Sequence, residues 1–205
     1  GLVTARAAGV VEGAFVVGFD PGSDGTLSVR GAGSQVNVAG NLVVGDEGEG
    51  TVRVFDGGYL ENQGLGLIGA FGGGSEGKVT VTGTASVWKS VDDLVVGSGG
   101  KGILRVLDGG TVQSAYGAFI GGIGPAADGT ATVSGTNSLW SVEDFMSIGG
   151  EGAGGTLNSL DGGRVTTKIA DIGSYPDDTG TVKVDGPGSV FEQTEKKLIV
   201  GFDGD

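Results

Sequence analysis

Three aspartates recur in the same setting, and carboxylates are the side chains of this sequence best suited to catalysis. Asp56, Asp108 and Asp161 each precede two glycines, and they lie 52 and 53 residues apart. Cleavage of a glycosidic bond uses two carboxyl groups that lie about 5–9.5 Å apart. No second acidic residue recurs with these aspartates, whereas Asp-Gly sequences favour turns. The pattern therefore indicates a repeated turn, in which we expect Gly109 and Gly110 to adopt positive φ.

Aromatic residues form a second recurring set. They end the segments TGTASVW (82–88), SGTNSLW (134–140) and DGPGSVF (185–191), and Val36 takes the same place in RGAGSQV (30–36). The candidate aromatic column is thus Trp88, Trp140 and Phe191. Such rings can stack on a sugar or a partner at a surface, or fill a core. The apolar neighbours favour the core, but one residue of each neighbouring pair could face outward, so both interpretations stay open.

Acidic residues gather in glycine-rich segments of the chain. They include Asp46, Glu47, Glu49, Glu76, Asp128, Glu151, Asp177 and Asp178. Calcium would need several oxygen ligands that converge on one point, and these acids do not recur in register. We therefore expect a solvated acidic edge, with no metal site and no cofactor.

The composition excludes several classes of function. The chain of 205 residues contains neither histidine nor cysteine, which excludes Ser-His-Asp and Cys-His catalysis and disulfides. Its net charge of −13 argues against nucleic-acid partners and anionic membrane surfaces, because both call for basic patches. No apolar run approaches the roughly 18–20 residues that cross a bilayer, so we expect no direct membrane insertion. The first residue is Gly rather than Met, and we expect a piece of a longer protein.

A sequence repeat indicates which secondary-structure elements position these residues. Short apolar runs such as LVVG and LIVG end in a glycine, and successive closing glycines are 27, 24, 28, 24, 28, 24 and 28 residues apart. These glycines are Gly18, Gly45, Gly69, Gly97, Gly121, Gly149, Gly173 and Gly201. Two kinds of unit alternate: a short unit with Asp-Gly-Gly and a long unit with Gly-x-x-Ser-apolar-aromatic. Self-similarity at a period of this size is typical of solenoids.

Each unit contains three short apolar stretches, and the first of them alternates as a half-buried strand does. Val79 and Val81, for example, would face inward, and Lys78 and Thr80 outward. A unit this short cannot bury a core alone, but stacked units can. We therefore predict an all-β fold, a right-handed parallel β-helix with three strands per coil and about seven coils. The alternative of an ordinary β-sandwich does not explain the alternating intervals.

The repeat resembles that of a known family. The run from GTVRVFDGG through LIG and GKVTVTGTASVW to LVVG is similar to the repeats of type V autotransporter passengers and of some PEP-CTERM-sorted bacterial surface proteins. The resemblance extends from about Phe15 to Gly201, although Phe191 and Val36 replace the usual tryptophan. It implies an exported bacterial protein, anchored at the outer membrane or secreted, whose β-helical stalk often serves adhesion or aggregation. We accordingly expect one β-helix domain over 15–205, a fragment of a longer passenger, after an irregular segment at 1–14.

A column of residues two positions before each closing glycine is the candidate interface. It comprises Val16, Val43, Leu67, Val95, Phe119, Ser147, Asp171 and Ile199. Because the flanking residues should face inward, this column should face outward, and an exposed apolar strip usually marks an interface. The alternative is that the long turns fold back and cover it. The members that we single out are Val43, Leu67, Val95, Phe119 and Ile199.

These observations favour a non-enzymatic passenger segment that acts as a stalk and an adhesin. A rigid rod with long repeated faces can bind through many weak contacts at once. The expected partner is a host surface, a matrix component or a second copy of the chain, and not nucleic acid. Two alternatives remain, a polysaccharide-degrading β-helix enzyme and a purely structural spacer.

Overall fold

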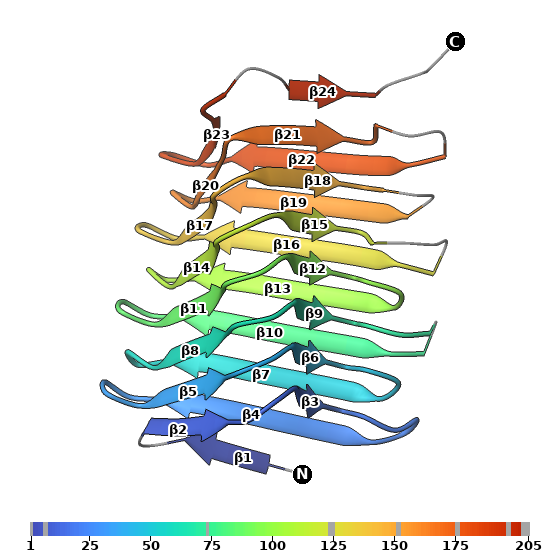
Figure 1. Ribbon diagram of the computed structural model, residues 1–205. Coiled ribbons are helices and arrows are strands. Elements are labelled where there is room, and N and C mark those ends of the chain that lie inside the picture. The colour runs from blue at the N-terminus through green and yellow to red at the C-terminus, as the bar shows by residue number, and fades with distance from the viewer. Residues whose placement is uncertain are drawn as a thin grey trace.

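The computed structural model describes residues 2–5, 8–72, 74–122, 126–150, 153–174, 177–195 and 198–201. The elements in these ranges are all β-strands, and they form a solenoid of three parallel, eight-stranded sheets. Each coil adds one strand to each sheet in turn, and the coils stack from the N-terminal to the C-terminal end (Figure 1). Seven turns separate the first strand of each sheet from its eighth. The predicted parallel β-helix with three strands per coil is confirmed.

The first sheet contains eight strands, and all but the first of them are longer than any strand of the other two sheets. The eight strands are β1 (Leu2–Ala5), β4 (Asp24–Arg30), β7 (Glu49–Phe55), β10 (Glu76–Thr82), β13 (Lys101–Leu107), β16 (Asp128–Ser134), β19 (Gly154–Leu160) and β22 (Thr179–Asp185). The expected alternation is present in β10, where Val79 and Val81 are buried and Lys78 is exposed. Val184, at the equivalent inward position of β22, is exposed, and β22 is the last strand of this sheet in the described part of the chain.

The other two sheets consist of short strands. The second sheet contains β2 (Ala8–Val11), β5 (Gln35–Val38), β8 (Tyr59–Asn62), β11 (Val87–Ser90), β14 (Thr111–Ser114), β17 (Leu139–Val142), β20 (Arg164–Thr167) and β23 (Val190–Gln193). The third sheet contains β3 (Phe15–Val17), β6 (Leu42–Val44), β9 (Gly66–Ile68), β12 (Leu94–Val96), β15 (Ala118–Ile120), β18 (Phe145–Ile148), β21 (Ile169–Ile172) and β24 (Leu198–Val200). Among the described residues there is no helix that could cross a membrane.

Exact register between coils builds one continuous core. Val79 of β10 lies opposite Val52 of β7 and Leu104 of β13, and all three side chains are fully buried. Equivalent side chains therefore stack at about 4.8 Å, the spacing of hydrogen-bonded strands. Each coil buries its apolar side chains against its neighbours, at roughly 25 cal/mol per Å² of apolar surface removed from water. The core thus runs along the rod and positions both the corners and the outer faces.

The N-terminal segment differs from the expectation of an irregular stretch over residues 1–14. It supplies two strands of the first coil, since β1 pairs in parallel with β4 and β2 pairs in parallel with β5. These pairings satisfy backbone groups that β4 and β5 would otherwise leave unpaired at the end of the stack. The segment lacks the glycine-containing corner motif of the later coils, which is why the repeat pattern did not reveal its strands.

The Asp-Gly-Gly segments form tight corners between the first and second sheets. Asp108 and Gly109 have φ angles of 52° and 87°, and the Gly110 N–H donates a hydrogen bond to the Leu107 carbonyl at 2.9 Å. Positive φ at both central residues is the mark of a type I′ turn. The expectation of positive φ is therefore right for Gly109 and wrong for Gly110. Glycine is needed at position 110 because a Cβ there would lie 2.5 Å from the Val81 carbonyl oxygen.

Hydrogen bonds join the two kinds of corner. The backbone N–H of Gly109, in a short coil, donates to Oγ of Ser138 in the next, long coil at 3.0 Å. The Ser138 hydroxyl in turn donates to the Ser134 carbonyl at 2.7 Å. The same N–H to hydroxyl contact joins Gly57 to Ser86 and Gly162 to Ser189. The Asp-Gly-Gly corner thus supplies a donor that the Gly-x-x-Ser corner accepts, which gives the alternation of short and long units a physical basis.

Candidate functional site

The recurring aspartates lie at these corners. Asp56, Asp108 and Asp161 all have positive φ, and equivalent corners are two coils apart, about 10 Å. Asp56 accepts a hydrogen bond from Arg30 Nε at 2.9 Å, and Asp108 accepts a longer one from Thr82 Oγ1 at 3.4 Å. No group of three or more potential metal ligands occurs in the described parts of the chain. The structure therefore gives these aspartates a role in the turn.

The candidate aromatic column lies in the core. Trp88 and Trp140 are fully buried, and Phe191 is partly buried and packs against the same core. The interpretation of this column as a surface for stacking on sugars is thus wrong for the two tryptophans. Both project inward from the second sheet, opposite Leu60 and Val112 in the case of Trp88. Their large apolar rings fill the interior, where aromatic side chains contribute most to stability.

Each indole N–H has a hydrogen-bond acceptor on the preceding coil. Trp88 Nε1 donates to Asn62 Oδ1 at 2.8 Å, and Trp140 Nε1 donates to Ser114 Oγ at 3.1 Å. Both acceptors are fully buried and precede their tryptophan by 26 residues. A ring N–H needs such a partner when it is buried. These acceptors do not belong to the aromatic motif, although their constant offset of 26 residues is a signal in the sequence that could identify them.

Some residues of the acidic edge form ion pairs with neighbouring lysines. Glu76 pairs with Lys78 at 2.9 Å and with Lys101 at 3.4 Å, and the hydrogen bond from Lys78 is the main cause that lowers its pKa. Asp46 is different, because burial raises its pKa. Glu151 lies outside the described residues. Glu49 and Glu76 lie opposite each other on β7 and β10, so the expectation that the acids do not recur in register is wrong for these two. No three potential metal ligands come together in the described ranges.

The candidate interface lies on the outer side of the third sheet. In β6, Leu42 and Val44 belong to the main core, whereas Val43 belongs to a separate outer cluster with Leu67 and Ala70. Val16, Leu65 and Val95 pack against this outer cluster. Val43 and Leu67 are 7% and 9% exposed, while Val95, Phe119 and Ile199 are partly exposed. The expectation of an exposed residue is therefore wrong for Val43 and Leu67, whereas Val95 and Phe119 are accessible.

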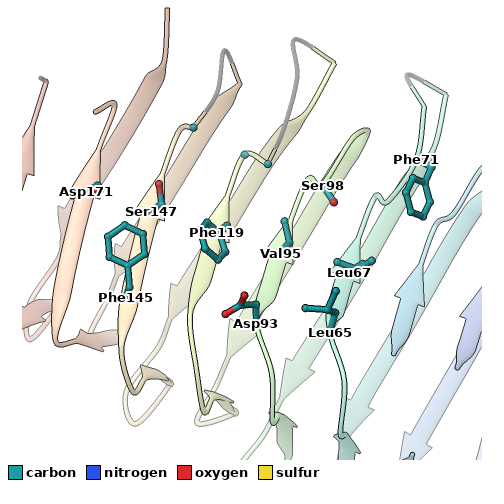
Figure 2. Close-up of a pocket in the computed structure, with 13 residues that line it drawn as sticks. Leu65, Leu67, Phe71, Asp93, Val95, Ser98, Phe119, Phe145, Ser147 and Asp171 are labelled. Atoms are coloured by element: carbon teal, nitrogen blue, oxygen red, sulfur yellow. The ribbon is translucent and has the colours of Figure 1, made fainter. Parts of the chain in front are cut away.

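The accessible part of this face is a groove of about 500 Å³. It extends across successive coils (Figure 2). Its lining consists of Leu65, Leu67, Phe71, Asp93, Val95, Ser98, Phe119, Gly121, Gly122, Phe145, Ser147, Gly150 and Asp171. Three of the predicted interface residues, Leu67, Val95 and Phe119, line the groove, whereas Val43 and Ile199 do not. The volume falls within the range of about 300–1,000 Å³ that ligand sites commonly have.

Aromatic side chains that the sequence analysis missed complete the groove. Phe145, at the start of β18, has its ring centroid 6.0 Å from that of Phe119 on the preceding coil, and the two rings are tilted by 58°. Phe71 follows β9 and is 58% exposed. Phe71 lies in a glycine-rich turn and Phe145 in the first position of its strand, so the column rule applied to the third strands could not identify either.

The described charges around the third sheet are mostly negative. Its eight strands contain no lysine or arginine, and Asp171 is their only charged residue. Acids flank the sheet at the described corners, with Asp92, Asp93, Glu143, Asp144 and Glu195 before its strands and Asp20, Asp46, Glu47, Asp177 and Asp178 after them. At these described corners Lys168 is the single cation. The other described lysines and arginines lie in strands of the first and second sheets.

Asp93 has a defined place at the rim of the groove. Its Oδ1 accepts a hydrogen bond from the Gly117 N–H of the next coil at 2.8 Å. Asn41 makes the equivalent contact two coils earlier, where its Oδ1 accepts from the Leu65 N–H at 3.0 Å. One carboxylate oxygen of Asp93 thus accepts a hydrogen bond from the backbone just before β15. The negative charge of Asp93 lies beside the apolar lining of the groove (Figure 2).

Comparison with known proteins gives one informative relative. Over 134 residues, or 62% of this chain, the sequence is 34% identical to the adhesin BmaC autotransporter of Brucella suis biovar 1 (strain 1330). The match spans 4% of the length of that protein. No family model matches the chain, and no solved structure gives a significant match. The chain is therefore similar to a small part of an autotransporter adhesin.

Proposed function

We propose that this chain is a segment of a bacterial autotransporter passenger that acts as both stalk and adhesin. The observation that carries the proposal is the 34% identity to an autotransporter adhesin. The β-helical fold of the chain fits that relationship, since stacked coils form an elongated body with repeated faces. The segment would be exported by type V secretion and stand at the cell surface, anchored through the outer membrane or released.

The geometry of the rod supports an adhesive role. Seven turns at about 4.8 Å give a length of about 34 Å, along which equivalent positions recur at every coil. A surface of this kind can make several weak contacts at once, and the sum is stronger than any one of them. The groove on the third sheet combines accessible aromatic side chains with a hollow shape.

The position of the carboxylates favours a non-enzymatic role over polysaccharide cleavage. The repeated aspartates hold corner turns and lie about 10 Å apart, beyond the range of about 5–9.5 Å used by pairs of glycosidase carboxyls. Incubation of the purified chain with pectin-like and other glycan polymers, followed by a reducing-sugar assay, tests this point. Turnover that disappears in an Asp108→Asn variant would favour the enzyme.

A bead assay tests the adhesive function directly. Fluorescent beads coated with the purified chain are added to cultured mammalian cells, to immobilised matrix proteins, to a glycan array and to bacteria that display the full-length protein. We expect saturable binding that the soluble chain inhibits, whereas beads coated with an unrelated acidic protein of similar charge do not bind. If none of these surfaces binds the beads, the segment is a spacer and the adhesive role is wrong.

A further inference from the structure

The outer face of the third sheet is an apolar surface that the described residues leave accessible over the middle coils. Leu65, Val95, Phe119 and Phe145 are partly exposed in the groove, and Phe71 is 58% exposed at its edge. From β9 to β21 the groove spans four coil steps, or about 19 Å. An extended peptide of about six residues has this length. The shape therefore suits a polypeptide segment that lies along the rod.

The charge of this face selects among possible occupants. Asp93 and Asp171 line the groove, the corners on both sides of the sheet are acidic, and its strands contain no lysine or arginine. An occupant with apolar and positively charged side chains would pack against the apolar lining and pair with the acidic residues at both edges of the groove. An acidic or neutral polar occupant would satisfy neither.

A second copy of the chain is a poorer match. Two third sheets placed face to face would bring acidic edges against acidic edges, and each chain carries a net charge of −13. The first sheet of a second copy offers cations, but most of them already have partners: Arg30 pairs with Asp56, Lys78 and Lys101 with Glu76, and Lys183 with Asp185. The charge pattern therefore favours a foreign partner over self-association.

We propose that the groove on the third sheet binds a cationic amphipathic polypeptide segment of the adhesion partner. Its apolar side chains contact Val95, Phe119 and Phe145, and its lysine or arginine side chains lie beside Asp93 and the acidic corners. This inference rests on the proposed adhesive role and names the class of partner and the face that binds it.

The test uses the purified chain and three labelled peptides of about eight residues, a length that spans the groove with about one residue to spare at each end. One peptide alternates leucine and lysine, the second serine and lysine, and the third leucine and glutamate. Fluorescence anisotropy at about 0.15 M salt, where surface charges are screened beyond about 8 Å, measures binding. We expect the leucine–lysine peptide to bind at least about tenfold more tightly than the other two, which corresponds to about 1.4 kcal/mol.

Two matched pairs of variants locate the binding. Phe71→Ser removes a ring that lines the groove and is 58% exposed. Phe19→Ser is its control, because that ring is 60% exposed and does not line the groove. Asp93→Asn removes a charge but keeps an oxygen that can accept from Gly117, and Asp108→Asn removes a charge at a distant corner. We expect the groove variants to weaken binding of the leucine–lysine peptide by about three- to tenfold, which corresponds to about 0.7–1.4 kcal/mol, and the other two to leave it unchanged.

Several outcomes would overturn the inference. Equal binding of the serine–lysine peptide would show a general attraction to negative charge, and equal effects of Phe71→Ser and Phe19→Ser would place the peptide elsewhere. Sedimentation that shows dimers, dissociated by Phe71→Ser, without peptide binding would make a second copy the occupant. If beads coated with the Phe71→Ser, Asp93→Asn double variant still adhere to cells as the unaltered chain does, the adhesive role stands and this face is not its site.

Discussion

The indole Nε1 of Trp88 donates a hydrogen bond to Oδ1 of Asn62, 2.8 Å away on the preceding coil. Asn62 is fully buried, and its Nδ2 also donates to Ser90 Oγ and to the Gly64 carbonyl. One amide thus satisfies the polar group of a fully buried tryptophan and links two successive coils in doing so. At the last aromatic position the residue is Phe191, which has no N–H, and the Thr167 hydroxyl on the preceding coil donates to backbone carbonyls instead.

The first prediction follows from this contact. Trp88→Phe should lower the free energy of unfolding by about 2–4 kcal/mol, since it leaves a cavity and deprives a buried amide oxygen of its donor. Trp140→Phe should cost less, because the Ser114 hydroxyl can rotate toward another acceptor. Denaturant titrations of the two variants measure the difference. Equal losses would show that ring volume alone determines the cost.

The second prediction concerns the bond between corners. Ser138→Ala removes an acceptor for the Gly109 N–H and a donor to the Ser134 carbonyl, and should cost about 1–2 kcal/mol. Ser141→Ala, on the partly exposed outer side of β17, should change stability by less than about 0.5 kcal/mol. Thermal unfolding followed by circular dichroism compares them. A Ser138→Ala variant as stable as Ser141→Ala would mean that the corners do not depend on each other.

The third prediction separates the two glycines of a corner. Gly109→Ala introduces a side chain at a φ of 87° and should cost about 1 kcal/mol. Gly110→Ala should cost about 3 kcal/mol, because its Cβ would meet the Val81 carbonyl oxygen, a backbone atom that cannot move aside easily. Asp108→Asn should be nearly neutral, since asparagine adopts positive φ readily. The reverse order of the two alanine variants in a denaturant titration would contradict this account of the corner.

The fourth prediction concerns pH. Burial and the hydrogen bond that Tyr59 donates to Glu61 raise the pKa of the Tyr59 phenol to about 12. Because this value lies above the unfolded value of about 10, the contribution to stability is complete below about pH 10 and is lost as the pH rises toward 12. The same hydrogen bond lowers the pKa of Glu61, which adds stability above the unfolded pKa of that group and loses it as the pH falls through the folded pKa.

Tyr59→Phe tests this pair. The variant should lose less stability than the unaltered chain between about pH 9 and about pH 11.5, and the absorbance titration of the tyrosines should lose its component near pH 12. Denaturant midpoints at the two pH values give the first quantity. A parallel decline in both proteins would show that Tyr59 does not titrate as the structure implies.

The fifth prediction tests which side chains of the third sheet face outward. The double variant Val95→Lys, Phe119→Lys should keep the β-sheet circular dichroism spectrum of the fold, because both side chains are partly exposed on the outer face. Val96→Lys, one position along the same strand, should prevent folding, since Val96 is fully buried and an unpaired buried charge costs several kcal/mol. Unfolding of the double variant would place Val95 and Phe119 inside the core.

The sequence predicted much of the fold because glycine and alternating valines recur at fixed intervals. Val79 and Val81 could be assigned to the core from period-two alternation, and Asp108 could be assigned to a turn from its glycines. The strands of residues 2–11 were missed because the sequence between them lacks the glycine corner motif, and their role depends on pairing with β4 and β5. The groove was only partly predicted, since Phe71 and Phe145 join Phe119 through stacking of coils and not through a position shared in the repeat.

Each Asp-Gly-Gly corner donates a hydrogen bond to a serine of the next coil, and this bond determines how many coils such a rod can gain or lose at once. Removal of one coil would place two corners of the same kind next to each other, and the N–H of Gly109 would meet no serine hydroxyl. Removal of two coils, a stretch of 52 residues between Asp56 and Asp108, preserves the order of the corners. Gene duplication or deletion should therefore retain such rods when it adds or subtracts pairs of coils, so that homologues differ in length by even numbers of coils.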